Sequence, residues 1–125
     1  MKAIVSKSIE DELRSDAEVS PRIEKLMRNA RDASDFLKAI SNESRLLLLC
    51  LLAERERSVG ELEAILGMRQ STVSQSLARL RYDDFVTTRR DGKTIYYSIA
   101  NPDVKRVLTI IYDIFCEGET DKPAA

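Results

Sequence analysis

Apolar side chains recur at helical spacing along much of the chain. A first helix is predicted over residues 21–40, where one apolar stripe follows a serine–proline pair suited to a helix start. A second is predicted over 43–54 and is apolar on nearly every side, so it should lie at the centre of the domain. A last amphipathic helix is predicted from 103 to about 117.

Between these helices the sequence predicts a helix-turn-helix. Ser58 can cap a short helix that ends at Leu66, and Glu61 is placed three residues on as its capping-box partner. Gly67 can take the left-handed conformation that ends this helix and starts a sharp turn. The next helix, within 67–81, has a polar face rich in short donors and acceptors: Gln70, Ser71, Thr72, Ser74, Gln75 and Arg79.

Two β-rich runs follow, from Val86 to Ile99, and should form a hairpin joined at Asp91-Gly92. A helix followed by a basic hairpin is the layout of a winged helix-turn-helix, a mainly α fold with a small β-hairpin wing. Because Gln and hydroxyl side chains can read base edges, we expect base contacts from Gln70, Ser71, Thr72, Ser74 and Gln75. Phosphate contacts are expected from Arg79, Arg89, Arg90 and Lys93. Alternatively, the helix is a plain polar surface and the hairpin tip a solvated turn, or the module binds proteins alone.

Composition sets the remaining bounds. The 125 residues are 43% hydrophobic, enough for one small domain that would gain from burying more surface in a dimer. The net charge of −1 does not suggest a nucleic-acid partner, but six of the basic residues lie between Gly67 and Lys93. We expect a mobile arm over 1–20, the DNA-binding and dimerisation domain over 21–117, and a disordered tail over 118–125.

Other function classes find little support. The chain has no histidine, no acids paired in an apolar setting and no glycine-rich phosphate loop, so an enzyme is not expected. No apolar run approaches the ~20 residues of a membrane span, and the N-terminus lacks the apolar core of a signal peptide. A cytoplasmic protein is therefore expected.

The runs Q-S-T-V-S-Q-S-L-A-R-L-R, from Gln70, and V-T-T-R-R-D-G-K-T-I-Y-Y-S-I, from Val86, resemble the ArsR family of dimeric winged-helix repressors. The resemblance implies a homodimer formed by the first and last helices and two recognition helices facing palindromic operator DNA. The apolar stripes could instead pack within one subunit. Ser76 stands where the family often has His, and Asp83-Asp84 stands where a Gly commonly ends the helix.

Without histidine or a Cys-x-Cys pair before the recognition helix, a metal site of the usual ArsR kind is not expected, and no cofactor is predicted. The runs L-L-L-L-C-L-L around Cys50 and Y-D-I-F-C ending at Cys116 resemble the dithiol of the persulfide-responsive BigR and SqrR repressors. That resemblance implies that reactive sulfur species, acting as inducer, link the two cysteines by a disulfide or polysulfide and release the operator. Alternatives are general oxidants or electrophiles acting on the same dithiol, or cysteines that are only structural.

Overall fold

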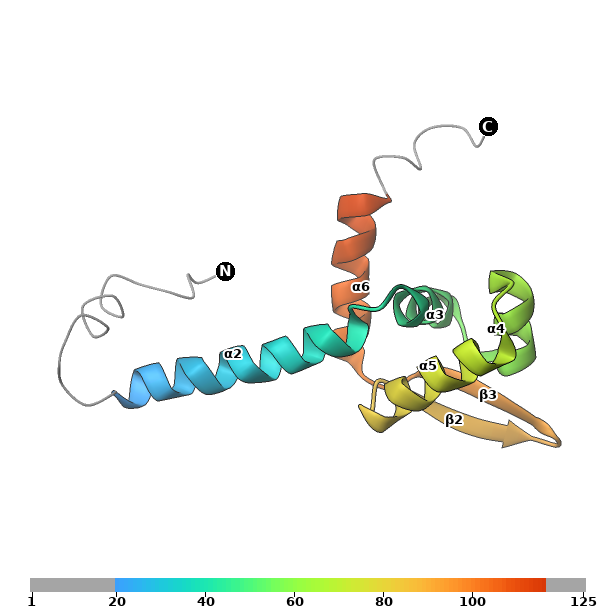
Figure 1. Cartoon of the computed structure of the whole chain (residues 1–125), viewed down its shortest axis with the longest axis horizontal. Helices are drawn as coiled ribbons and strands as arrows, with labels where there is room; N and C mark the ends of the chain where they lie inside the picture. Colours follow the sequence, from blue (N-terminus) through green and yellow to red (C-terminus); the bar gives the residue numbers. More distant parts are fainter. Residues whose placement is uncertain (1–19, 117–125) are drawn as a thin grey trace. The chain divides into compact units, whose positions relative to one another are not determined.

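The structure is a computed structural model that describes residues 20–116. The chain divides between Lys38 and Ala39 into two compact units. Within the described residues, Figure 1 labels the helices α2 (Pro21–Ile40), α3 (Glu43–Glu54), α4 (Val59–Leu66), α5 (Gln70–Tyr82) and α6 (Pro102–Phe115) and the strands β2 (Val86–Asp91) and β3 (Thr94–Ile99). A shorter strand, β1, is Arg57–Ser58. The mainly helical fold with a β wing is the one predicted.

Helix α3 is the centre of the second unit, as its sequence predicted. The side chain of Asn42 accepts a hydrogen bond from the Arg45 N–H at 3.1 Å and caps its first turn. Leu48, Leu49 and Leu52 are buried, because α3 contacts α4, α5, α6 and β3. In Figure 1, α3 lies between α6 on one side and α4 on the other. The buried helix α3 therefore packs against the helix-turn-helix, the wing and the last helix, and fixes their positions within this unit.

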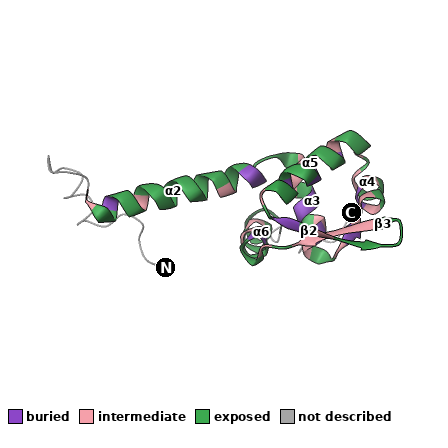
Figure 2. Ribbon diagram, turned by 90° about the horizontal axis from the view of Figure 1, so that it is seen from below, coloured by how far each residue is buried: buried purple, intermediate pink, exposed green. Residues whose placement is uncertain are grey.

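The helix-turn-helix forms as expected. The Ser58 hydroxyl accepts from the Glu61 N–H, and the Glu61 carboxylate accepts from the Ser58 N–H, both at 3.2 Å. Gly67 ends α4 at φ +63°, where a residue without Cβ is least strained. Val73, Leu77 and Leu80 are the buried apolar side of α5, and Figure 2 shows the outer surfaces of this helix exposed.

The turn after α5 has the backbone geometry of a helix end that usually contains glycine, although an aspartate stands there. Asp84 takes the left-handed conformation at φ +59°. Its N–H donates to the Arg81 carbonyl at 3.0 Å, and the Phe85 N–H donates to the Leu80 carbonyl at 2.9 Å. These two bonds form a Schellman motif, which normally carries glycine at the position of Asp84. The backbone geometry is therefore that of a usual helix end, with an aspartate accepting the strain.

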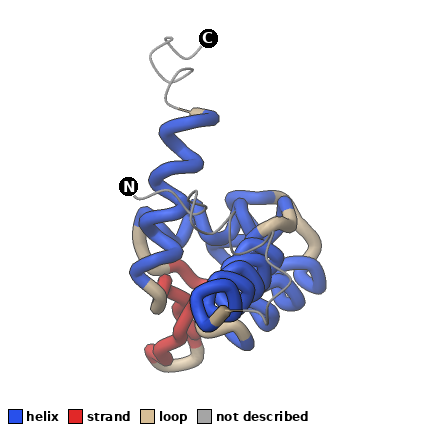
Figure 3. The backbone as a smooth tube through the Cα atoms, turned by 90° about the vertical axis from the view of Figure 1, so that its left-hand side faces the viewer, coloured by secondary structure: helices blue, strands red, loops and turns tan. Residues whose placement is uncertain are grey.

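The wing is larger than the predicted hairpin. Asp91 pairs with Thr94, so the connecting residues are Gly92 and Lys93 and not Asp91-Gly92, and Gly92 has φ +64°. Sequence analysis missed β1, which pairs with β3 to give the antiparallel order β1-β3-β2. Figure 3 shows the strands gathered in one small sheet.

Helix α6 begins with Pro102 in its first turn, after Asn101, whose side chain accepts from the Asp103 N–H at 2.9 Å. It ends at Phe115, and Cys116 is its C-cap. The predicted tail and nearly all of the predicted arm lie outside the described residues. Within residues 20–116, no helix is long and apolar enough to cross a membrane.

Candidate DNA-binding face and thiol pair

The first turns of α5 carry the predicted base readers. Gln70, Ser71, Ser74 and Gln75 are exposed and Thr72 is half-buried. No side chain caps the start of α5, in contrast to α3 and α4. An uncapped helix start presents backbone N–H groups and the positive end of the helix dipole, both suited to phosphate.

Two polar residues of α5 are not freely available to a ligand. Ser76, which stands where the family often has His, is only 8% exposed and lies on the packed side, so it is not available as a base or phosphate contact. Arg79 is exposed but bonded within its own helix: its Nε donates to Asp83 Oδ2 at 2.7 Å. A phosphate would have to compete with Asp83 for this guanidinium.

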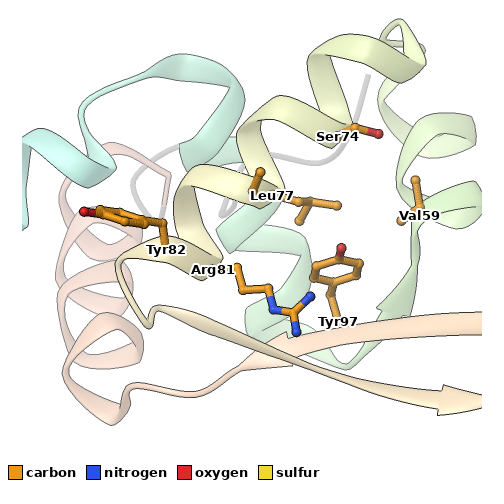
Figure 4. A pocket seen from close by; sticks show the side chains of 7 residues that line it. Val59, Ser74, Leu77, Arg81, Tyr82 and Tyr97 are labelled. Carbon is orange, nitrogen blue, oxygen red and sulfur yellow. The ribbon is translucent and has the colours of Figure 1, made fainter.

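A hollow of about 360 Å³ lies between α5 and β3 and is shown in Figure 4. Ser74 and Leu77 line it from the recognition helix, while Tyr97 lines it from the wing sheet. The Arg81 side chain extends from the end of α5 toward the wing in the same view. Ser74 therefore belongs both to the exposed polar face of α5 and to the lining of this hollow.

The three predicted basic residues of the wing are in different situations. Arg90 and Lys93 are exposed, and no ion pair is recorded for either within residues 20–116. Arg89 is bound to Glu56: its Nε donates to both carboxylate oxygens at 2.9 Å, and its Nη2 donates to Oε1. The Arg89 guanidinium carbon also lies 4.6 Å from the centroid of the Tyr96 ring.

This ion pair perturbs both partners. The hydrogen bond from Arg89 lowers the pKa of Glu56, and the same bond raises the pKa of Arg89. Glu56 is a functional candidate that sequence reasoning missed, because the two residues are 33 positions apart and nothing local pairs them.

The two cysteines are both free and exposed, although Cys50 stands in a run of leucines. Cys50 is exposed as a residue but partly surrounded by its neighbours, and this partial burial raises the pKa of its thiol; the negative charges of Cys116 and Glu54 raise it further. Helices α3 and α6 contact each other, Cys50 and Tyr112 line the same groove, and the Cys116 N–H donates to the Tyr112 carbonyl at 2.8 Å. The fold thus brings the end of α6 to the side of α3.

A groove of about 430 Å³ opens beside Cys50, between α3 and α6. Leu51 and Leu108 contribute apolar walls, whereas Glu54, Lys105 and Tyr112 contribute polar groups. Low-molecular-weight reagents can therefore reach the thiol from solution. No group of His, Cys, Asp and Glu able to hold a metal ion occurs within residues 20–116.

Next to this groove, Arg57 connects α3 to the wing sheet. Its side chain is only 10% exposed. Its Nη2 donates to Glu54 Oε1 at 2.7 Å and its Nε to the Leu51 carbonyl at 3.1 Å, both in the last turn of α3. Its backbone pairs with Tyr97 of β3.

Comparison with known proteins shows what the chain resembles as a whole. Residues 42–88 match the model of the "bacterial regulatory protein, arsR family". A biofilm growth-associated repressor of Agrobacterium fabrum is 44% identical over 92 residues, which are 74% of this chain and 79% of the relative. The transcriptional activator HlyU of Vibrio cholerae is 38% identical over 96 residues, 77% of this chain and 89% of the relative.

The solved structures agree. The crystal structure of the transcriptional repressor BigR from Xylella fastidiosa superposes with a TM-score of 0.70 at 40% identity, covering 81% of this chain and 98% of that one. Reduced HlyU from Vibrio cholerae has a TM-score of 0.72 at 38% identity, with 75% and 99% covered. The chain belongs to the ArsR family of bacterial transcriptional regulators, with the BigR repressors and HlyU among its relatives.

Proposed function

We propose that this regulator represses transcription by binding operator DNA as a homodimer, and that it releases the DNA when reactive sulfur species link Cys50 to Cys116. Membership of the ArsR family supports the part of this proposal that concerns DNA binding and transcriptional regulation. The observation that supports the sensing step is the placement of the two cysteines: Cys50 lies on α3, Cys116 ends α6, and these two helices contact each other along the groove that Cys50 and Tyr112 line.

Base reading is assigned to the exposed first turns of α5. Gln75 and Gln70 can pair with adenine, while Ser71, Thr72 and Ser74 are more permissive readers. Arg90 and Lys93 meet phosphate from the wing or enter the adjacent minor groove, and Arg79 and Arg89 join them only after leaving their carboxylate partners.

Exposed apolar side chains support dimerisation. Ile110, Ile114 and Phe115 of α6 are exposed, as are Met27 and Leu37 of α2 in the other unit. A soluble protein rarely leaves a contiguous apolar surface in water. Pairing these helices with those of a second copy around a two-fold axis would cover them and present two recognition helices to a palindromic operator.

The linking reaction needs only the persulfide as oxidant. The thiolate of one cysteine attacks the outer sulfur of a persulfide R–S–SH; the R–S⁻ leaves and takes a proton, and the protein carries Cys–S–SH. The second thiolate attacks the protein sulfur of that group, forming the disulfide and releasing HS⁻. A longer bridge forms when further persulfide sulfur is added before closure, each sulfur coming with the release of one thiol R–SH.

The bridge would change DNA binding through the helices it joins. Cys50 is on α3, which supports the recognition helix, and Cys116 ends α6, a proposed dimer helix. A covalent link between them would favour one arrangement of these helices over another. The dimer population then shifts from a form whose recognition helices fit two half-sites to one whose helices do not.

Mass spectrometry of the reduced protein after glutathione persulfide or hydrogen peroxide, with operator binding followed on the same samples, tests the proposal. We expect an intramolecular Cys50–Cys116 link after persulfide, together with release of the DNA. Cys50→Ser and Cys116→Ser should bind the operator normally and stay bound in persulfide. Normal release by either variant would refute the dithiol mechanism.

A second candidate, a sensor of general oxidants, is favoured by the same two exposed thiols. Hydrogen peroxide would oxidise one thiolate to a sulfenic acid, and the other thiolate would displace hydroxide to give a disulfide. Equal DNA release by peroxide and by persulfide would support this wider specificity, whereas release by persulfide alone would exclude it.

A further inference from the structure

We propose that Glu56 is a specificity-determining residue that competes with DNA phosphate for Arg89. In the free protein its carboxylate occupies the guanidinium, so a wing contact is made only by DNA that can displace it. This inference depends on the chain being a DNA-binding regulator and is independent of the cysteines.

Arg89 binds the Glu56 carboxylate in the geometry in which an arginine binds an anion such as phosphate. Arg89 directs Nε and Nη2 to one carboxylate, which is the two-donor edge that arginine also offers to phosphate. Tyr96 lies against the guanidinium, 4.6 Å from ring centroid to carbon. With an edge bonded and a face stacked, Arg89 is held in one orientation beside β3.

The other two predicted basic residues of the wing differ from Arg89 because no carboxylate of the described residues is bound to them. Within residues 20–116, Arg90 and Lys93 have no recorded ion pair, so they meet phosphate without first losing a partner. Glu56 precedes β1 and Arg89 lies in β2, so the pair spans the sheet from one outer strand to the other. At neutral pH Glu56 is ionised as any ordinary glutamate is, and because the hydrogen bond from Arg89 lowers its pKa, it continues to compete at more acidic pH than a free glutamate would.

The effect should be strongest on DNA of random sequence. Non-specific binding depends almost wholly on phosphate contacts, whereas a correct operator adds base contacts that help to hold the wing in place. Masking one arginine therefore lowers non-specific affinity more than specific affinity. Glu56 would in this way increase discrimination without touching a base.

The test is a double-mutant cycle on the full-length protein. Glu56→Gln, Arg89→Gln and the double variant are compared for binding to a labelled duplex of random sequence, by fluorescence anisotropy across a series of salt concentrations. Glu56→Gln should raise affinity by up to about fivefold, the upper end of what an exposed ion pair contributes. The slope of log K against log salt should steepen by roughly 0.9, equivalent to one added phosphate contact.

The cycle separates competition from simple charge. In the Arg89→Gln background, Glu56→Gln should give no gain, because no guanidinium remains to be released. Asp91→Asn removes the same charge from the end of β2, where Asp91 acts on Arg89 through its charge but forms no ion pair among the described residues, and should give a smaller gain. A gain that survives in the double variant, an equal gain from Asp91→Asn, or no gain from Glu56→Gln would each overturn the proposal.

Discussion

Replacing Arg57 by glutamine should remove the two hydrogen bonds that join the end of α3 to β1. The Leu51 carbonyl would lose its partner at 3.1 Å, and Glu54 would lose its partner at 2.7 Å. The fold would keep its apolar core, so the loss can be worked out from these groups and their exposure to water.

The two lost bonds differ in value. The Glu54 side chain is 67% exposed, so water can replace the guanidinium and the ion pair contributes about 1 kcal/mol or less. The Leu51 carbonyl lies beside an arginine side chain that is only 10% exposed, and losing a charged donor there costs about 1–2 kcal/mol. We expect a total of about 2 kcal/mol, or a fall in Tm on the order of 10 °C for a domain of this size.

Arg55→Gln is the matched control. Arg55 also makes an ion pair, with Glu61 at 2.9 Å, but the two side chains are 60% and 35% exposed, so its loss should cost clearly less than the loss of Arg57. Urea unfolding followed by circular dichroism, with both variants and the parent at one protein concentration, measures the difference. Equal losses for the two variants would refute the argument that burial gives Arg57 its larger contribution.

Three further outcomes are expected. Alkylation of Cys50 by iodoacetamide should increase with pH to a midpoint above that of a free cysteine, because partial burial and the Cys116 charge raise the pKa of its thiol. Cys116→Ser should lower that midpoint, and an unchanged midpoint would argue against an interaction between the two thiols. Asp84→Gly should stabilise the protein by roughly 0.5–1 kcal/mol in urea unfolding, since glycine adopts a positive φ with less strain, and a loss of stability would contradict this. Gln75→Ala should cost about 1–3 kcal/mol of binding free energy at particular base pairs. Arg90→Gln should instead weaken binding to all DNA sequences alike and flatten the slope of log K against log salt by roughly one charge. Equal losses on operator and random DNA for Gln75→Ala would refute its role as a base reader.

The features that sequence reasoning recovered are those determined within a few residues. Ser58 and Glu61 stand three positions apart and form the predicted capping box, and Gly67 takes the predicted left-handed turn. The bounds of α3 follow from Asn42 and an uninterrupted apolar run. Such signals involve one helix turn at a time, so they can be read before the fold is known.

The features that were missed depend on distant partners. Strand β1 has only two residues, too few for a period, and exists because β3 is there to pair with it. Likewise, Arg89 was expected to be free for DNA, but folding places Glu56 beside it.

The turn between α5 and β2 has a consequence for the operator itself. Three successive backbone N–H groups, those of Asp83, Asp84 and Phe85, donate hydrogen bonds to carbonyls of α5 at 2.9–3.1 Å. The connection between α5 and β2 is therefore held in one conformation. In the proposed complex with DNA, the backbone therefore sets the distance along the duplex between the bases contacted by α5 and the phosphates contacted by the wing. We expect operators of this regulator to tolerate changes in the number of base pairs between half-sites better than an insertion within a half-site.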